Sequence, residues 1–414
     1  MLIALAASIC TFGAGSNFAL EIFGNANMDD TIDEKDIKYL ESIINGSSHT
    51  TEFADVNLDG EINQNDKELM EKIIEDDEEE ITIIDDLGKT VTIRRPIERI
   101  ILLQHNMCLY ETLRALNVEN KVIGCTDYFV NLSSNWDSSY VYFPKLAEAE
   151  NIGSVSEPDK EKVVSLKPDV ILTDGLAPSI DLSNELLGVP VISMDVRMNT
   201  LEKNTKKYGY IFDEREKADE YISWWKNWEQ VLDESLAGLS DEDRPLVLLK
   251  TFNSPNTENY KIVGKSNMRA DPIRKAGARN LGDYSAVNGT TFEPDLEWIL
   301  KQNPSKILLI TGNRYMGYDV HNTSEVEQLR ESFMNNPKYS ALDAAKSGNV
   351  YMISEFISIG GANGLLAAVY HAKQFHPDLF MDLDPTAVHQ EYIDRFQDVH
   401  YDIKENNGTF VYPR

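Results

Sequence analysis

Cysteine is scarce in this chain of 414 residues. The three cysteines are Cys10, Cys108 and Cys125, and none has the close spacing of a zinc site. Cys10 lies in the N-terminal apolar segment, so the rest of the chain can form at most one disulfide. Stability therefore does not rest on cysteine. Two cysteines are also too few to hold a metal cluster, which argues against a cluster enzyme.

Basic residues are almost missing from the first fifth of the chain. Residues 1–80 hold 20 Asp and Glu against 4 Lys and no Arg, and the whole chain has a net charge of -30. Such a surface repels phosphate backbones and anionic headgroups, so we expect no nucleic-acid partner and no binding to membrane surfaces. The same charge attracts divalent cations, which makes calcium the ion to look for.

Motifs of catalysis are also missing. The sequence contains no Gly-x-Ser-x-Gly, no His-Glu-x-x-His, no phosphate-binding Gly-x-x-x-x-Gly-Lys and no dinucleotide fingerprint. We therefore predict that the protein is not an enzyme.

Long apolar runs are limited to one, at the N-terminus. Residues 2–9 (LIALAASI) read as the apolar part of a secretory signal within a signal-like segment over residues 1–19, although the usual positive charges are missing. No other segment approaches the ~20 apolar residues of a membrane span. We expect an extracytoplasmic protein, secreted or associated with the cell surface.

An internal repeat follows. Residues 25–44 and 55–74 align without gaps, and each begins with a loop rich in oxygen-bearing side chains followed by a stretch of helical periodicity. Oxygen ligands at loop positions 1, 3, 5, 7, 9 and 12 wrap a calcium ion. The predicted calcium ligands are Asn25, Asn27, Asp29, Thr31, Asp33 and Asp36 in the first loop and Asp55, Asn57, Asp59, Glu61, Asn63 and Asp66 in the second.

This repeat resembles the type I dockerin module over residues 24–76, because position 12 is Asp where EF-hands have Glu. The first loop departs from the pattern: Asn25 replaces an acid, and Asp30 replaces the glycine of the sharp turn, Gly60 in the second loop. We predict two calcium sites, the second stronger. The resemblance implies a cohesin module as partner, although the partner-reading positions, Glu34-Lys35 and Gln64-Asn65, are not the usual hydroxylic pair.

The acidic run at residues 75–80 (EDDEEE) predicts an extended linker, with a solvated helix end as the alternative, and residues 77–96 are assigned to linker and leading hairpin. Beyond it, apolar strands alternate with helical stretches, which predicts two α/β lobes with largely parallel sheets. The lobes are assigned to residues 97–200 and 243–414. The segment 201–242 is assigned to the interlobe helix, because residues 214–237 lack Gly and Pro and carry apolar residues at helical spacing. The predicted strands are 100–103, 122–124, 170–173, 189–193, 246–250, 306–310 and 350–353.

The body resembles the iron-siderophore/cobalamin family of periplasmic binding proteins over residues 81–400. The sequence segments that carry the resemblance include Asp86-Leu87-Gly88, Leu166-Lys167-Pro168-Asp169, Asn303-Pro304 and Gly348-Asn349-Val350-Tyr351. The resemblance implies a class III binding-protein fold, two α/β lobes joined by one long helix, here preceded by a small all-α calcium module. It also implies that Glu161 and Glu297 dock onto the permease dimer of an ABC importer.

Ligands of such folds bind between the lobes, at the carboxyl ends of the strands. The candidate ligand-binding residues are His105, Tyr128, Phe252, Arg314, Tyr315 and Glu355. The cargo implied by the resemblance is a metal chelate, either a ferric siderophore, haem or a corrinoid. The alternative function is a dockerin-tethered component of a cell-surface scaffold or adhesion system whose α/β body binds another ligand.

Overall fold

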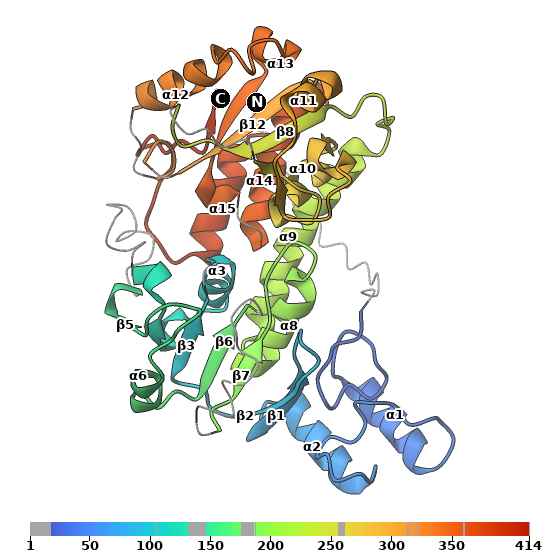
Figure 1. The fold of residues 1–414 in the computed structure, drawn as a ribbon. Coiled ribbons are helices and arrows are strands. Elements are labelled where there is room, and N and C mark those ends of the chain that lie inside the picture. Colours follow the sequence, from blue (N-terminus) through green and yellow to red (C-terminus); the bar gives the residue numbers. More distant parts are fainter. Residues whose placement is uncertain are drawn as a thin grey trace. The chain divides into compact units, whose positions relative to one another are not determined.

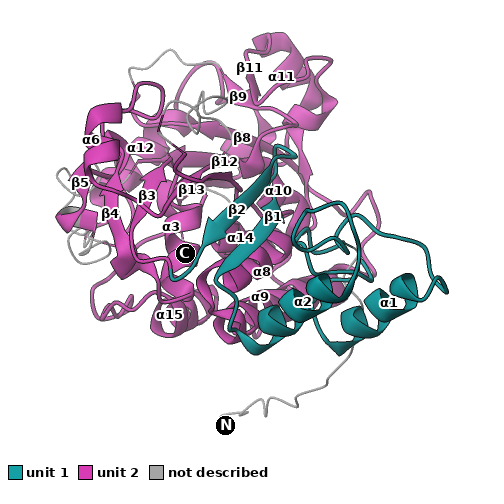
Figure 2. Cartoon of the chain, turned by 90° about the horizontal axis from the view of Figure 1, so that it is seen from below, with its two compact units in different colours: residues 1–96 teal, residues 97–414 magenta. Residues whose placement is uncertain are grey.

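The fold is described from a computed structural model of the full chain. The structure describes residues 18–104, 106–130, 146–174, 186, 188–255, 261–312, 314–318, 320, 322–358 and 361–413. The chain divides into two compact units, residues 1–96 and 97–414, which Figure 2 shows in different colours. Each unit is described by itself below.

The first unit holds both calcium-type loops and the leading hairpin. Its regular elements are α1 (Glu34–Ile44), α2 (Gln64–Glu75), β1 (Glu80–Ile84) and β2 (Thr90–Arg94). Strands β1 and β2 pair antiparallel, and Ile22 forms an antiparallel bridge with Ile83. The hairpin is thus joined to the residues that precede the first loop.

The acidic run is not the extended linker that its charge predicts. Helix α2 continues to Glu75, Asp76 closes it in the left-handed conformation with φ 58°, and β1 begins at Glu80. Within the short connection, Glu78 is buried and forms an ion pair with Arg95. This opposite charge relieves the like-charge repulsion on which the prediction of extension rested.

The N-terminal lobe of the second unit is built on a five-stranded parallel sheet with strand order β5-β4-β3-β6-β7. All residues of β3 and β6 are buried, as expected for parallel strands covered on both faces. The elements of this lobe are β3 (Ile100–Leu103), α3 (Cys108–Ala115), β4 (Val122–Cys125), β5 (Glu150–Asn151), α6 (Lys160–Ser165), β6 (Val170–Thr173), β7 (Val191–Ser193) and α8 (Leu201–Phe212).

The C-terminal lobe repeats this plan with strand order β10-β8-β12-β13-β14, in which only β14 runs antiparallel to its neighbour. A small antiparallel pair, β9 and β11, lies outside the main sheet. The elements are β8 (Leu246–Thr251), β9 (Ile262–Val263), α10 (Asp271–Lys275), β10 (Arg279–Asn280), β11 (Thr291–Phe292), α11 (Leu296–Gln302), β12 (Lys306–Thr311), α12 (Ser324–Met334), α13 (Asp343–Lys346), β13 (Val350–Ser354), α14 (Gly361–Phe375), α15 (Pro385–Phe396) and β14 (Val411–Tyr412).

The segment assigned to one interlobe helix contains two. Helix α8 ends at Phe212, Asp213 turns the chain with φ 60°, and α9 then runs from Arg215 to Leu236. A Cβ on Gly209 would lie 2.7 Å from the Cβ of Ala218, so the glycine allows the two helices to pack closely. Helix α9, about 33 Å long, contacts α3 and α8 of one lobe and α14 of the other (Figure 1).

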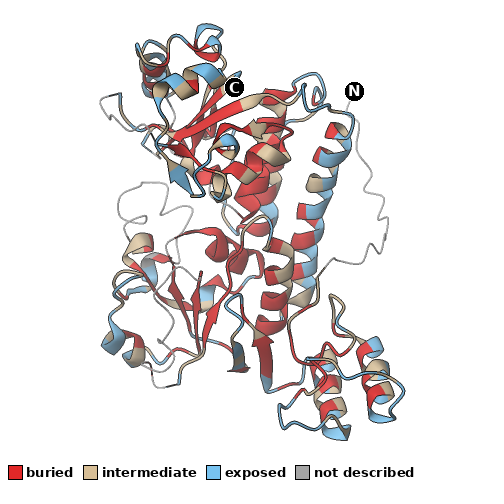
Figure 3. Ribbon diagram, turned by 45° about the vertical axis from the view of Figure 1, so that its right-hand side comes forward, coloured by how far each residue is buried: buried red, intermediate tan, exposed pale blue. Residues whose placement is uncertain are grey.

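Figure 3 shows that the strands of both sheets are buried, whereas the outer helices expose one side to solvent. Within the described ranges, no helix is long and apolar enough to cross a membrane. The predicted two-lobed α/β class is confirmed, and the strand starts predicted at residues 100, 122, 170, 246, 306 and 350 agree with the structure.

Candidate functional site

The two calcium-type loops share the hydrogen bonds made by their closing aspartates. In the first loop, the Oδ1 of Asp36 accepts the N–H of Asn27 at 3.0 Å and its Oδ2 accepts the N–H of Asp33 at 2.8 Å. The corresponding distances from Asp66 to Asn57 and Asn63 are 3.3 and 2.9 Å. Asp36 and Asp66 are fully buried, and each stands at the third position of a helix that it helps to cap. The closing residue therefore fixes its loop to the start of the next helix.

The hydrogen bonds in the middle of the first loop also recur in the second loop. The N–H of Asp29 donates to Oδ1 of Asn27 at 2.8 Å, and the N–H of Thr31 donates to Oδ1 of Asp29 at 2.9 Å. In the second loop, the same bonds from Asp59 to Asn57 and from Glu61 to Asp59 measure 2.9 and 2.8 Å. The loops hold their oxygen-bearing side chains in one arrangement, although the sequence around them differs.

Electrostatics in the first loop favour a bound cation. Burial raises the pKa of Asp36 to about 6, and the neighbouring charges of Asp29 and Asp33 act in the same direction. A divalent cation would offset the charge of the buried Asp36 and of the partly exposed Asp29 and Asp33 beside it. Among the described residues, no three His, Cys, Asp or Glu side chains converge on one point, so a calcium ion here would also need amide and backbone oxygens.

The first position of the first loop provides an amide oxygen of this kind. Asn25 is fully buried, and its Oδ1 is one of the buried polar atoms without a hydrogen-bond partner in the described part of the chain. Asp55 differs, since its carboxylate accepts the N–H groups of Asp59 at 3.1 Å and Gly60 at 2.9 Å. The residues present in both loops therefore fit a calcium ion.

One prediction about the first loop is wrong. Asp30 does not take the positive φ expected of the turn position, whereas Gly60 does, with φ 88°. The residues that adopt a left-handed backbone in both loops are Met28 and Leu58, at loop position 4. Backbone strain at Asp30 therefore does not distinguish the two sites, and the difference in charge between Asn25 and Asp55 remains.

In the second unit, polar side chains gather where the strands of the N-terminal lobe end. The Nδ2 of Asn106, shortly after β3, donates to Oδ2 of Asp174, after β6, at 2.9 Å. The Oδ1 of Asn106 accepts the N–H of Cys108 at 3.0 Å and so fixes the start of α3. Gln104 is fully buried, and neither polar atom of its side chain has a partner within the described ranges.

The charges of Glu355 and Arg269 in the C-terminal lobe act on Tyr128 in the N-terminal lobe. Burial raises the pKa of Tyr128 above its usual range, and the charge of Glu355 adds to the shift while that of Arg269 opposes it. Arg269 Nη2 lies 2.9 Å from Glu355 Oε1. Tyr128 follows β4 of one lobe, whereas Arg269 and Glu355 belong to the other. Sequence reasoning missed Arg269, because no strand end or motif marks its position.

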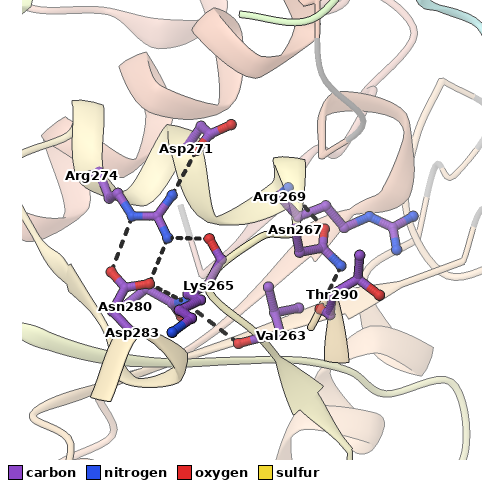
Figure 4. A network of polar contacts seen from close by, with 9 residues as sticks. All are labelled: Val263, Lys265, Asn267, Arg269, Asp271, Arg274, Asn280, Asp283 and Thr290. Carbon is purple, nitrogen blue, oxygen red and sulfur yellow. Dashed lines mark hydrogen bonds and ion pairs between the residues drawn. The ribbon is translucent and has the colours of Figure 1, made fainter. Parts of the chain in front are cut away.

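A polar network holds the loop that carries Arg269 (Figure 4). Asn267 accepts the N–H of Arg269 at 3.0 Å and donates to the carbonyl of Thr290 at 3.0 Å. Nearby, Arg274 binds Asp271 and Asp283 at 2.6 and 2.5 Å. In Figure 4 the guanidinium of Arg269 points away from the Arg274 cluster, which leaves it directed to Glu355.

The other predicted ligand residues lie in different surroundings. Phe252 is buried, and its ring packs edge-on against Phe333 with centroids 5.2 Å apart. The Arg314 side chain is 77% exposed, lies 3.7 Å from Glu325, and stands over the ring of Tyr315. Tyr315 packs on the core of the C-terminal lobe. His105 lies outside the described residues.

A surface hollow of about 430 Å³ lies elsewhere, along α15 and the segment after it. Its lining includes Gln390, Arg395 and Lys404, and it contains none of the predicted ligand residues.

Glu161 and Glu297 occupy equivalent places. Each is an exposed second residue of a short helix, α6 or α11, and each follows a capping aspartate, Asp159 or Asp295. Lys167 and Asn303, with φ 49° and 45°, end these segments before the next strand of each lobe. Each lobe therefore presents a short helix that begins after a capping aspartate and exposes a glutamate at its second residue.

Comparison with known proteins identifies the architecture. The profile of the family described as periplasmic binding protein matches residues 106–355. The chain belongs to the periplasmic binding protein family. A second profile, that of the dockerin type I domain, matches residues 24–75, so this binding protein carries a dockerin at its N-terminal side, as the repeat predicts. A dockerin domain implies calcium binding.

Individual relatives of this binding protein are distant. The molybdate-binding protein MolA of Haemophilus influenzae is 24% identical over 352 residues, which cover 77% of this chain and 91% of that protein. Among solved structures, the TroA-like periplasmic binding protein FepB of Veillonella parvula has a TM-score of 0.65 at 22% identity, over 80% of this chain and 98% of that one. CeuE of Helicobacter pylori, in a nickel-histidine complex, has a TM-score of 0.59 at 18% identity, over 79% and 98%. These structures share the class III fold.

Proposed function

We propose that this periplasmic binding protein captures a metal chelate outside the cytoplasm and delivers it to the permease of an ABC importer. The observation that carries the proposal is the two-lobed body with an exposed glutamate at the same helix position in each lobe. A permease dimer has two related halves, so one acidic contact in each lobe fits a positively charged partner of two-fold symmetry.

The proposed ligand site lies between the lobes, around Tyr128, Arg269 and Glu355. Support comes from the electrostatic influence of Glu355 and Arg269 on Tyr128 and from the ion pair between Arg269 and Glu355. Such a site offers an aromatic ring, a cation and a carboxylate, a set that can orient a polar chelate. His105, Phe252, Arg314 and Tyr315 remain candidates on sequence grounds. A ferric siderophore, haem and a corrinoid are the three classes of cargo.

We further propose that the dockerin holds calcium through the twelve loop residues named above, with the stronger site at Asp55–Asp66, and that it binds a cohesin module. Support comes from the dockerin profile, the matched hydrogen bonds of the loops and the unpartnered Oδ1 of Asn25. A bound cohesin would tether the protein to a cell-surface assembly, so the scaffold role and the transport role are compatible.

The scaffold role alone, without import, is the second candidate function, and the dockerin is the feature that favours it.

The test is a ligand titration of the purified full chain. Ferric siderophores, haem, cobalamin, cobinamide, molybdate and nickel-histidine would each be added while the fluorescence of the five tryptophans is followed. Saturable binding of one class at micromolar or lower concentration, about -8 kcal/mol or better, supports import and names the cargo. Absence of binding across the panel, together with capture of a cohesin module in calcium, would favour the scaffold role instead.

A further inference from the structure

Residues 20–23 are hydrogen-bonded on two sides. Toward the first calcium loop, the N–H of Leu20 donates to the carbonyl of Asp29 at 2.8 Å. Toward the hairpin, the N–H of Phe23 donates to the carbonyl of Thr82, and the N–H of Ile84 donates to the carbonyl of Glu21, both at 2.9 Å. The same short segment therefore forms an edge of the loop and pairs with β1 through an isolated antiparallel bridge between Ile22 and Ile83.

Asn25 connects this segment to the ion site. Its Nδ2 donates to the carbonyls of Leu20 and Asp29, both at 2.7 Å, while its buried Oδ1 has no partner among the described residues. Rotating the amide toward a different partner would break both bonds of Nδ2. A calcium ion bound by Oδ1 would hold the amide in the orientation that keeps Leu20 in place.

The second loop lacks this arrangement. Asp55 takes the place of Asn25, and its carboxylate accepts N–H groups from within its own loop, those of Asp59 and Gly60. A carboxylate has no N–H to donate to a neighbouring strand. The side chain at the first position of the loop therefore reaches the segment that pairs with β1 in the first loop and not in the second.

Apolar packing connects the segment to the rest of the dockerin. Leu20, Ile22 and Phe23 are buried, and the ring of Phe23 meets that of Phe53 edge-on with centroids 5.5 Å apart. The N–H of Gly24 donates to the carbonyl of Phe53 at 2.8 Å. The position of residues 20–23 therefore depends on the folded state of the module that carries both loops.

We propose that calcium binding in the first loop and the pairing of residues 20–23 with β1 stabilise each other, so that removing calcium releases this segment from the hairpin. The inference rests on the proposed calcium sites. Coupling of this kind is reciprocal: if calcium favours the paired segment, the paired segment must raise the affinity of the first loop for calcium by the same factor. The leading hairpin is then a calcium-dependent part of the dockerin.

Hydrogen exchange at single amides tests the coupling in the full chain. The reporters are the N–H groups of Phe23 and Ile84, which join the segment to β1. The internal control is the N–H of Arg95, which donates to the carbonyl of Glu79 at 2.8 Å at the open end of the hairpin. After chelation of calcium with EGTA, we expect exchange at Phe23 and Ile84 to accelerate by roughly 5- to 150-fold, with little change at Arg95.

Matched variants locate the effect in the first loop. Asp29→Ala and Asp59→Ala remove the same side chain from loop position 5 of each copy, and each loses the same two kinds of hydrogen bond. Asp29→Ala should abolish the calcium-dependent protection of Phe23 and Ile84, whereas Asp59→Ala should preserve it. Equal effects of the two variants would overturn the inference.

The reverse experiment starts from the hairpin and does not alter the loop. Ile84→Pro removes the N–H that donates to Glu21 and should weaken calcium binding at one of the two sites, measured by calorimetry. Two calcium ions bound with unchanged exchange at Phe23 and Ile84 would refute the coupling and leave the proposed sites standing. Absence of calcium binding in the unmodified chain would instead refute the proposed sites themselves.

Discussion

Asn363 of α14 donates a hydrogen bond from its Nδ2 to the Oε2 of Glu111 in α3, at 2.6 Å. Both side chains are buried, and they belong to different lobes of the periplasmic binding protein body. Beside them, Gln397 Nε2 donates to the carbonyl of Glu111 at 3.3 Å, and Arg114 donates to the carbonyl of Gln397. A polar contact inside the protein thus joins the lobes in addition to α9.

The first prediction concerns this contact. Asn363→Ala would leave the buried carboxylate of Glu111 without its donor from the other lobe, and we expect a loss of about 2 kcal/mol in the free energy of unfolding. Glu111→Gln keeps an acceptor and removes the charge, so its loss should be smaller. Urea unfolding of the three proteins provides the comparison; equal stability of Asn363→Ala and the unmodified chain would contradict the role given to this bond.

The second prediction concerns docking on the permease. Replacing Glu161 and Glu297 together with Arg should stop uptake of the cargo while ligand affinity in the purified protein stays the same, because both residues are exposed at helix starts. Glu216→Arg is the matched control, since Glu216 is also an exposed second residue of a helix, α9. Each reversal opposes a helix dipole and costs only about 0.3–1 kcal/mol of stability. Normal uptake by the double variant would show that these residues do not dock.

The third prediction concerns calcium. Asp55→Ala combined with Asp59→Ala removes two carboxylates of the second loop and the acceptors of Gly60 and Glu61. We expect the stronger calcium site to be lost and calcium-induced folding of residues 24–76 to lose its cooperativity, followed by circular dichroism of the full chain during a calcium titration. An unchanged titration would contradict the assignment of these ligands.

The fourth prediction concerns acid. Burial lowers the pKa of His371 to about 4 and that of His389 to about 3, from an ordinary value of 6.5. Because the folded body resists protonation that the unfolded chain accepts, stability contributed by these residues is present above pH 6.5 and is lost as the pH falls toward 4. Each histidine should cost about 2 kcal/mol of unfolding free energy between pH 7 and pH 5.

A variant isolates one of these histidines. His389 lies 3.1 Å from the hydroxyl of Tyr318, so His389→Gln replaces the imidazole with a side chain that does not titrate and can still bind that hydroxyl. Its stability should fall less steeply below pH 6.5 than that of the unmodified chain, measured by urea unfolding at several pH values. Parallel curves for the two proteins would show that His389 is not a source of the acid sensitivity.

Local patterns in the sequence were sufficient to predict many of the helices, strands and loops of this protein. The repeat spacing predicted two loops, each followed by a helix, because each ligand set must recur at fixed loop positions. The helices α1 and α2 begin inside the loops, at Glu34 and Gln64, since Asp36 and Asp66 also cap them. The apolar runs predicted β3 and β6 at their observed bounds, because a strand covered on both faces needs an unbroken apolar stretch.

Contacts between distant residues were decided by the tertiary structure. Charge alone predicted an extended linker, but Arg95 neutralises Glu78 and the chain folds into the hairpin. Helical periodicity over residues 214–237 predicted α9 (Arg215–Leu236), but it did not show that Asp213 turns the chain there or that Gly209 lets the preceding helix, α8, pack on α9. Arg269 meets Glu355, and residues 20–23 pair with β1, although neither pairing has a local signature. Periodicity and composition indicate which face of a helix or strand is buried. They do not indicate which distant residue packs against that face, because the partner depends on how the folded chain brings the elements together.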